Sequence, residues 1–136
     1  MKQRIQWRVG AVTAALCIGL AAGASAQYAG WTIPDGGKDE KSPVKSAADA
    51  AKKGKSLYAS NCAKCHGPEA KGNGPDSDHA ADLTDEFRTD LNPEGILYYK
   101  MWNGHGSDMP AFKSKLTKDD VWALVEYLKV LRTPAK

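Results

Sequence analysis

The sequence has little cysteine and histidine, with only three residues of each among its 136. Two of the cysteines and one histidine lie together in the segment SNCAKCHGPEA, as Cys62, Cys65 and His66. The other two histidines, His79 and His105, lie far apart and form no pair. Because a structural zinc site needs four ligands, commonly supplied as closely spaced pairs, this composition argues against structural zinc.

Strand patterns are also missing. No stretch alternates apolar and polar residues convincingly enough to predict a β-strand, and no internal repeat is visible. A thioredoxin-like redox dithiol at Cys62 and Cys65 is expected in a βαβ setting, which the sequence does not offer. A disulfide between two residues three apart closes a very small loop and therefore stabilises little. The sequence predicts an all-α protein and disfavours both of these uses of the two thiols.

An excess of charge is absent beyond residue 26. The net charge of +3 equals the contribution of Lys2, Arg4 and Arg8, and the remaining sequence balances its 16 acidic residues with as many basic ones. This balance gives no support for nucleic-acid binding. The three N-terminal cations precede an uncharged run that ends in the small residues of 24–26, which predicts a secretory signal peptide over residues 1–26. The alternative is an uncleaved membrane anchor.

Three helices are predicted after an extended arm over residues 27–45, and the domain is expected over residues 46–136. Ala47, Ala51, Gly54 and Tyr58 share one face of the first helix. Gly54 costs about 1 kcal/mol there relative to alanine, which predicts that another backbone comes close.

The later helices are predicted from their end signals. The second helix is predicted from Asn92 as its N-cap, Pro93 at its first position and Gly104 as its stop. Thr117 and Asp120 form a variant capping box at the start of the third. Its apolar stripe consists of Val121, Leu124, Val125, Leu128 and Leu131. Between His66 and the second helix we expect a long loop with a short helical turn at residues 84–88.

Three short helices and long loops bury little apolar surface, and so small a domain needs additional stabilisation. The pattern Cys62-Ala63-Lys64-Cys65-His66 is the one that attaches a c-type haem. In that chemistry each thiol forms a thioether with one vinyl group of the porphyrin, and the histidine binds the iron. The sequence therefore predicts one covalently bound haem c, which fills the centre of the domain.

The segments GKSLYASNCAKCHG and DMPAF, together with the closing amphipathic helix, resemble the class I c-type cytochromes, above all the small bacterial monohaem proteins. The likeness covers about residues 47–131. It implies the cytochrome c fold, in which the first and last helices cross closely at Gly54 and Tyr58. Relatives often have a proline just before the segment that matches ADLTD, whereas this chain has Ala80 and Ala81. Which backbone carbonyl orients His66 is therefore open.

The second axial ligand of the iron distinguishes a carrier from an enzyme. The candidates are Met101, Met109, His79 and His105. Met101 lies at a helical position that suits core packing, His79 lies in an acidic loop, and His105 lies between two glycines where we expect it exposed. Met109 precedes Pro110 and matches the Met-Pro element of the resembled family. We expect Met109 to be the distal ligand opposite His66.

The resemblance implies a periplasmic single-electron carrier. Its donor would be a dehydrogenase or quinol-oxidising complex, and its acceptor a terminal oxidase or reductase. One alternative is a dedicated subunit of one dehydrogenase that docks through the arm at 27–45. Another is a small haem peroxidase or gas-binding protein with a labile Met109. Seven lysines near the haem motif or the Met109 segment predict a basic rim for an acidic partner: Lys52, Lys53, Lys55, Lys64, Lys71, Lys113 and Lys115.

Overall fold

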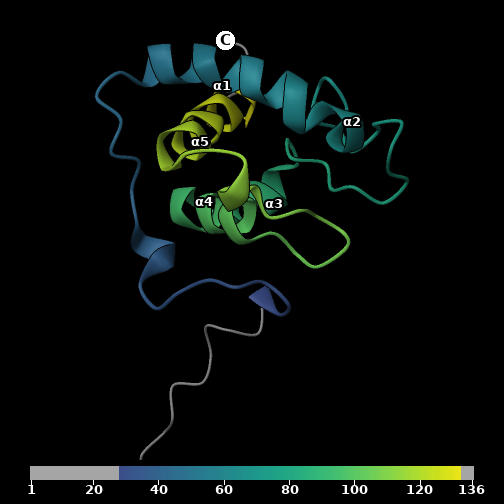
Figure 1. Ribbon diagram of the computed structural model, residues 1–136, viewed down its shortest axis with the longest axis horizontal. Helices are drawn as coiled ribbons and strands as arrows, with labels where there is room; N and C mark the ends of the chain where they lie inside the picture. The colour runs from purple at the N-terminus through teal and green to yellow at the C-terminus, as the bar shows by residue number, and fades with distance from the viewer. Residues whose placement is uncertain (1–27, 133–136) are drawn as a thin grey trace, which may run out of the picture.

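The computed structural model describes residues 28–132 as short helices joined by long loops (Figure 1). The elements in chain order are η2 (Gly37–Asp39), α1 (Ala47–Asn61), α2 (Ala63–His66), α3 (Glu86–Leu91), α4 (Glu94–Asn103), η3 (Phe112–Ser114) and α5 (Lys118–Arg132). The described residues contain no named strand, which confirms the predicted all-α class. The predicted signal peptide at 1–26 lies outside the described residues.

Helices α1 and α5 cross in close backbone contact at Gly54. A Cβ atom at Gly54 would collide with the carbonyl oxygen of Ala123 and would lie 2.8 Å from the Cβ of Tyr127. The prediction that another backbone approaches this glycine is confirmed. At the same crossing the rings of Tyr58 and Tyr127 lie 5.4 Å apart. Figure 1 shows α5 lying against α1, with α4 on the side of α5 away from α1.

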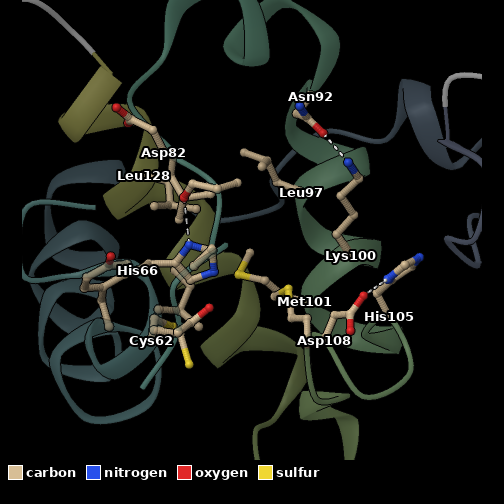
Figure 2. A pocket seen from close by; sticks show the side chains of 18 of the residues that line it. Cys62, His66, Asp82, Asn92, Leu97, Lys100, Met101, His105, Asp108 and Leu128 are labelled. Atoms are coloured by element: carbon tan, nitrogen blue, oxygen red, sulfur yellow. Dashed lines mark hydrogen bonds and ion pairs between the residues drawn. The ribbon is translucent and has the colours of Figure 1, made fainter. Parts of the chain in front are cut away.

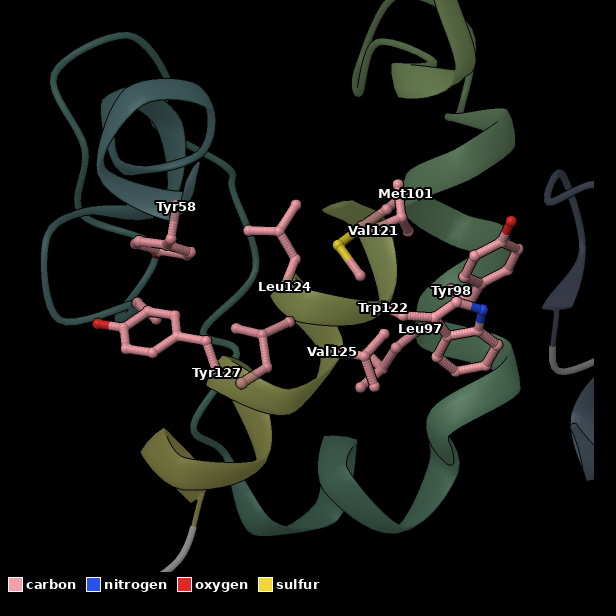
Figure 3. Packing of buried hydrophobic residues seen from close by; sticks show 11 residues of the cluster. Tyr58, Leu97, Tyr98, Met101, Val121, Trp122, Leu124, Val125 and Tyr127 are labelled. Carbon is pink, nitrogen blue, oxygen red and sulfur yellow. The ribbon is translucent and has the colours of Figure 1, made fainter. Parts of the chain in front are cut away.

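The core lies between these helices. Figure 3 shows Leu97 and Met101 of α4 facing Val121 and Val125 of α5, all of them buried. Met101 is only 5% exposed, in agreement with its expected packing role. None of the helices in residues 28–132 is long and apolar enough to cross a membrane.

The helix starts follow the predicted caps in one case and differ in another. At α5, the Thr117 N–H donates to Asp120 Oδ2 at 2.9 Å and the Asp120 N–H donates to Thr117 Oγ1 at 3.2 Å, so the capping box forms. At α4, the N-cap is Pro93 and not Asn92. Our N-cap prediction is wrong by one residue because α3 extends further than the turn expected at 84–88. Asn92 is thereby the residue that closes α3.

The arm packs along α4 on the side away from α1 (Figure 1). The Tyr28 hydroxyl donates to the carbonyl of Leu91 at 2.9 Å, and the Asn103 side chain donates to the carbonyl of Thr32 at 2.8 Å. Tyr28 is 8% exposed. These contacts make the arm a covering layer of the domain and bring its residues to one wall of the cavity described next.

Candidate functional site

A cavity of about 350 Å³ lies among α2, α4, α5, the loop that follows α2 and the arm. Its apolar lining comes mainly from Leu97, Phe112, Leu124 and Leu128. Volumes of this order are typical of sites for cofactors and small ligands. We call the side formed by Cys62, Cys65 and His66 the cysteine wall. The side formed by Trp31, Met101, His105 and Met109 is the methionine wall.

The cysteine wall is set by the end of α1 and the single turn of α2. The Cys62 N–H donates to the Tyr58 carbonyl at 2.8 Å, which closes α1, and the His66 N–H donates to the Cys62 carbonyl at 2.9 Å. This tight turn brings both thiols and the imidazole to the same cavity. Both cysteines are free thiols and partly buried.

The electrostatics at Cys62 do not suit a redox dithiol. Burial, and after it the neighbouring Cys65, raises the pKa of Cys62 to about 12. A thiol in such surroundings stays protonated at neutral pH, whereas redox-active and nucleophilic cysteines have lowered pKa values. The wall therefore offers two free thiols, of which Cys62 is neutral at pH 7, for addition to a ligand. Within residues 28–132 no three His, Cys, Asp or Glu side chains group together in a way that could hold a metal ion.

His66 is oriented by the loop after α2. Its Nδ1 lies 3.0 Å from the carbonyl oxygen of Ala81, and because a carbonyl only accepts, Nδ1 carries the proton. The other ring nitrogen, Nε2, then has its lone pair free, which is the state in which histidine binds a metal. Figure 2 shows this hydrogen bond on one side of the ring and the cavity on the other. The carbonyl that the sequence left open is that of Ala81.

The loop that supplies Ala81 is tied to α2 by backbone hydrogen bonds. The N–H groups of Gly72, Gly74 and Asp76 donate to the carbonyls of His66, Cys65 and Lys64 at 2.8, 3.1 and 2.9 Å. A Cβ atom at Gly74 would collide with the Lys64 carbonyl oxygen, so this close approach needs glycine. The long segment without regular structure is therefore a frame that holds His66 in place.

The methionine wall combines a turn with α4. The His105 N–H donates to the Met109 carbonyl at 2.7 Å, which closes the turn that presents Met109. Met109 is partly buried and lines the cavity, and so does the fully buried Met101. Both sulfur-bearing side chains thus reach the cavity, and Met109 as distal ligand stays a prediction.

His105 differs from its predicted exposed state. Its side chain is 33% exposed, and its ring lies 4.7 Å from the ring of Trp31. Nδ1 of His105 lies 3.4 Å from a carboxylate oxygen of Asp108. The expectation failed because the arm, which is distant in sequence, covers this turn. The other candidate, His79, has a side chain that is 70% exposed, as expected, and it contacts Asp78.

The donor set fits a haem c: two free thiols, an imidazole with a free Nε2, methionine side chains that line the same cavity, and an apolar lining. Sequence reasoning missed three polar or aromatic members of the lining, namely Trp31, Lys100 and Arg132. No local motif marks them, because they come from the arm, the middle of α4 and the end of α5.

Residues 49–128 match the protein family described as cytochrome C oxidase, cbb3-type, subunit III. The cbb3-type cytochrome c oxidase subunit FixP of Azorhizobium caulinodans is 35% identical over 82 residues, which are 60% of this chain and 27% of that protein. FixP of a Bradyrhizobium species is 35% identical over 89 residues, which are 65% of this chain and 30% of that protein. The chain thus spans about three-tenths of the length of these curated relatives.

Solved structures with similar folds are also c-type cytochromes or belong to larger assemblies. The c-type cytochrome KustC0563 superposes with a TM-score of 0.52 at 27% identity, over 59% of this chain and 98% of that chain. Cytochrome cL of Methylophaga aminisulfidivorans superposes with a TM-score of 0.52 at 27% identity, over 61% of this chain and 55% of that chain. A chain of a reducing HAO-like protein complex of Kuenenia stuttgartiensis superposes with a TM-score of 0.60 at 27% identity, over 67% of this chain and 47% of that chain.

Proposed function

The chain belongs to the cytochrome c family described as cbb3-type oxidase subunit III, and on that premise we propose that it is a periplasmic single-electron carrier with one haem c. Haem binding and electron transfer in respiratory chains are the properties of this family. The single haem, its ligands, its partners and its compartment belong to the proposal. So do the boundaries, with a signal peptide at 1–26, an arm at 27–45 and the cytochrome domain at 46–136.

The observation that carries the proposal is the hydrogen bond from His66 Nδ1 to the Ala81 carbonyl. This hydrogen bond leaves the lone pair of Nε2 available to bind a metal, on the wall that also holds the thiols of Cys62 and Cys65. In the proposal, Cys62 and Cys65 form the thioethers, His66 is the proximal ligand and Met109 the distal one. Haem c, when bound, supplies an iron that takes up and releases one electron.

The residues of the chain have separate roles in this proposal. The Ala81 carbonyl fixes the tautomer and the direction of the His66 ring. The thioether of Met109 would favour the reduced state of a bound haem iron and would leave no free position for a substrate. The apolar lining from Leu97, Leu124 and Leu128 limits access of water. This combination suits electron transfer better than chemistry on a bound substrate.

Exposed lysines close in sequence to the cysteine motif and to the Met109 segment support an acidic partner. All seven lysines of the predicted rim are exposed. Lys52, Lys53 and Lys71 have carboxylates within 4 Å, at Asp49, Asp120 and Asp82. Lys55, Lys64, Lys113 and Lys115 have none among the described residues. We propose that these four lysines steer the electron donor or acceptor to the cysteine wall.

The proposal is tested on the protein purified from a bacterial periplasm. Its intact mass after acid denaturation should equal residues 27–136 plus one haem, and its ferric spectrum should show the weak near-infrared band of a sulfur ligand. Electron transfer to an acidic redox partner should slow steeply as salt rises from about 0.1 M to 1 M, over which the Debye length falls from about 10 Å to 3 Å. Absence of covalent haem, or ready binding of carbon monoxide by the reduced protein, would contradict the carrier.

A second candidate is a dedicated subunit of a larger redox complex. It is supported by the names of relatives, since FixP is a subunit of a cbb3-type oxidase and the Kuenenia structure is a complex. Affinity purification of the tagged chain from its native membranes and periplasm distinguishes the two. A carrier should elute alone at moderate salt, whereas a subunit should elute with stoichiometric partner chains.

A further inference from the structure

Three of the side chains that line the cavity belong to lysine or arginine. Arg88 of α3, Lys100 of α4 and Arg132 at the end of α5 all line it. Figure 2 shows Lys100 and its partner Asn92 on the side of the cavity opposite Cys62 and His66. Lys100 and Arg132 are partly buried, whereas Arg88 is exposed at the rim.

The contacts of the two buried cations are with neutral groups. Lys100 Nζ donates to Asn92 Oδ1 at 2.7 Å and lies 4.6 Å from the ring centre of Trp31. Arg132 donates from Nε to the Leu83 carbonyl at 2.8 Å and from Nη1 to the Asn92 carbonyl at 3.3 Å. Carbonyl oxygens and an aromatic face stabilise a cation without neutralising its charge.

Carboxylates that line the cavity are engaged elsewhere. Asp82 accepts hydrogen bonds from the N–H and hydroxyl of Thr84, and Asp108 lies 3.4 Å from His105. Among residues 28–132, neither Lys100 nor Arg132 has a carboxylate within 4 Å. Burial, and then the charges of Arg88 and Arg132, lower the pKa of Lys100 to about 8. Partly buried like charges without an anion are unfavourable, so this arrangement calls for an anionic occupant.

We infer that Lys100 and Arg132, with Arg88 at the rim, form the subsite that binds the two carboxylate groups of the haem. This inference rests on the proposed function, because it assumes the haem that Cys62 and Cys65 attach. Haem c has two propionate carboxylates on the edge of the ring away from its vinyl-derived thioethers. Lys100 and Asn92 lie correspondingly on the side of the cavity away from Cys62 (Figure 2), and Arg132 contacts the same Asn92 through its carbonyl. The cofactor thus fits with its charged edge toward α3, α4 and the end of α5.

The subsite has a measurable consequence for the reduction potential. A nearby cation lowers the pKa of a carboxylate by about 1–3 units. With the cations present, the haem carboxylates should stay ionised throughout pH 5–7 and the potential should change little with pH. In Lys100→Met and Arg132→Gln their pKa should rise by about one unit or more. The potential should then fall as pH increases through this range, because an ionised carboxylate favours ferric iron.

The experiment measures the midpoint potential of the haem-loaded full-length protein from pH 4.5 to 8. Lys100→Arg keeps the charge and should retain the flat profile, and Lys38→Met removes a charge from an exposed residue of η2 and should also retain it. Profiles of Lys100→Met and Arg132→Gln that superimpose on wild type, with haem attached, overturn the inference.

A second measurement uses wild type alone and does not depend on the folding of variants. Redox-difference infrared spectra should show the haem carboxylates ionised down to about pH 4, and titration nearer pH 5–6 would overturn the inference. Failure of the proposed function is separate, since a wild-type protein without covalent haem is recognised from its intact mass before any variant is made.

Discussion

The two walls of the cavity are built in different ways. The cysteine wall takes Cys62, Cys65 and His66 from five consecutive residues, and one helical turn with its backbone hydrogen bonds fixes all three. The methionine wall takes Trp31 from the arm, Met101 from α4, and His105 and Met109 from the following turn. The first wall is a local structure, whereas the second forms only when the arm, α4 and the turn pack together.

This difference predicts how each wall responds to change. The cysteine wall should lose its ability to attach or bind a ligand when one of its own side chains is replaced. The methionine wall is formed by several segments, so we expect the loss of one contact to weaken the positioning of Met109 only in part.

Replacing both thiols, as in Cys62→Ser with Cys65→Ser, should abolish covalent attachment completely. Serine hydroxyls do not form the thioethers, and no other cysteine lies within the described residues. Acid extraction followed by mass measurement of the chain tests this. Met109→Ala is the matched control and should keep its haem through the extraction. Retention of haem by the double serine variant would disprove the assigned attachment site.

Met109→Ala should remove the near-infrared sulfur band and lower the potential by a sizeable part of the roughly 0.8 V range that axial ligands span. The vacated position should bind carbon monoxide, unless His105 replaces the methionine. The variant that also carries His105→Ala separates these outcomes.

Met101→Ala is the control for the ligand assignment. It should cost about 2–5 kcal/mol in the free energy of unfolding, as for a buried methionine, and should keep the band. Loss of the band in Met101→Ala with its survival in Met109→Ala would show that the assignment is reversed.

Gly54→Ala tests the crossing of α1 with α5, next to the cysteine wall. The added Cβ would collide with the Ala123 carbonyl, so α1 and α5 must separate. We expect a loss of about 1–3 kcal/mol in the free energy of unfolding, measured by chemical denaturation. Ser56→Ala on the exposed face of α1 is the control and should change stability by less than about 0.5 kcal/mol. Equal stabilities for the two variants would contradict the close contact.

Trp31→Ala should loosen the methionine wall without detaching the haem. The ring of Trp31 covers His105 and lies over the Lys100 ammonium group, and both contacts are lost. We expect faster binding of carbon monoxide and a cost of about 1–2 kcal/mol in stability. Trp31→Phe keeps an aromatic face and should give an intermediate result. Wild-type ligand kinetics in Trp31→Ala would mean that the arm does not help to hold Met109.

The smallest effect concerns the ion pair between α1 and α5. Lys53 Nζ lies 2.6 Å from Asp120, and its hydrogen bond, followed by those of Thr117, lowers the pKa of Asp120 to about 2. A carboxyl group with a lowered folded-state pKa adds stability above its ordinary pKa near 4, and this stability is lost as pH falls toward 2. Asp120→Asn should therefore cost about 1 kcal/mol at pH 7 and close to nothing at pH 2. If the stability difference between wild type and Asp120→Asn does not change with pH, the charge of Asp120 does not contribute to stability.

The sequence predicted the local features well and the assembled ones poorly. The all-α class, the Gly54 contact and the Thr117–Asp120 cap follow from patterns within a few residues, and all three are present. The exposure of His105 was predicted incorrectly because the arm covers its turn. The N-cap of α4 was predicted incorrectly because α3 is longer than expected. The family match supports the cytochrome reading of the cysteine motif, while the iron ligands themselves stay predictions.

The contact of Gly54 with Ala123 has a further consequence for the speed of electron exchange. It is a contact between two backbones, so no side-chain rotation can shorten or lengthen it. Helix α1 leads directly into Cys62, and α5 carries Leu124 and Leu128 along the same cavity. The packed interior resists small displacements, so the spacing between these elements should be the same in both charge states of the iron. A site whose atoms hardly move when the charge changes has a small reorganisation energy, and electrons cross it quickly even with little driving force.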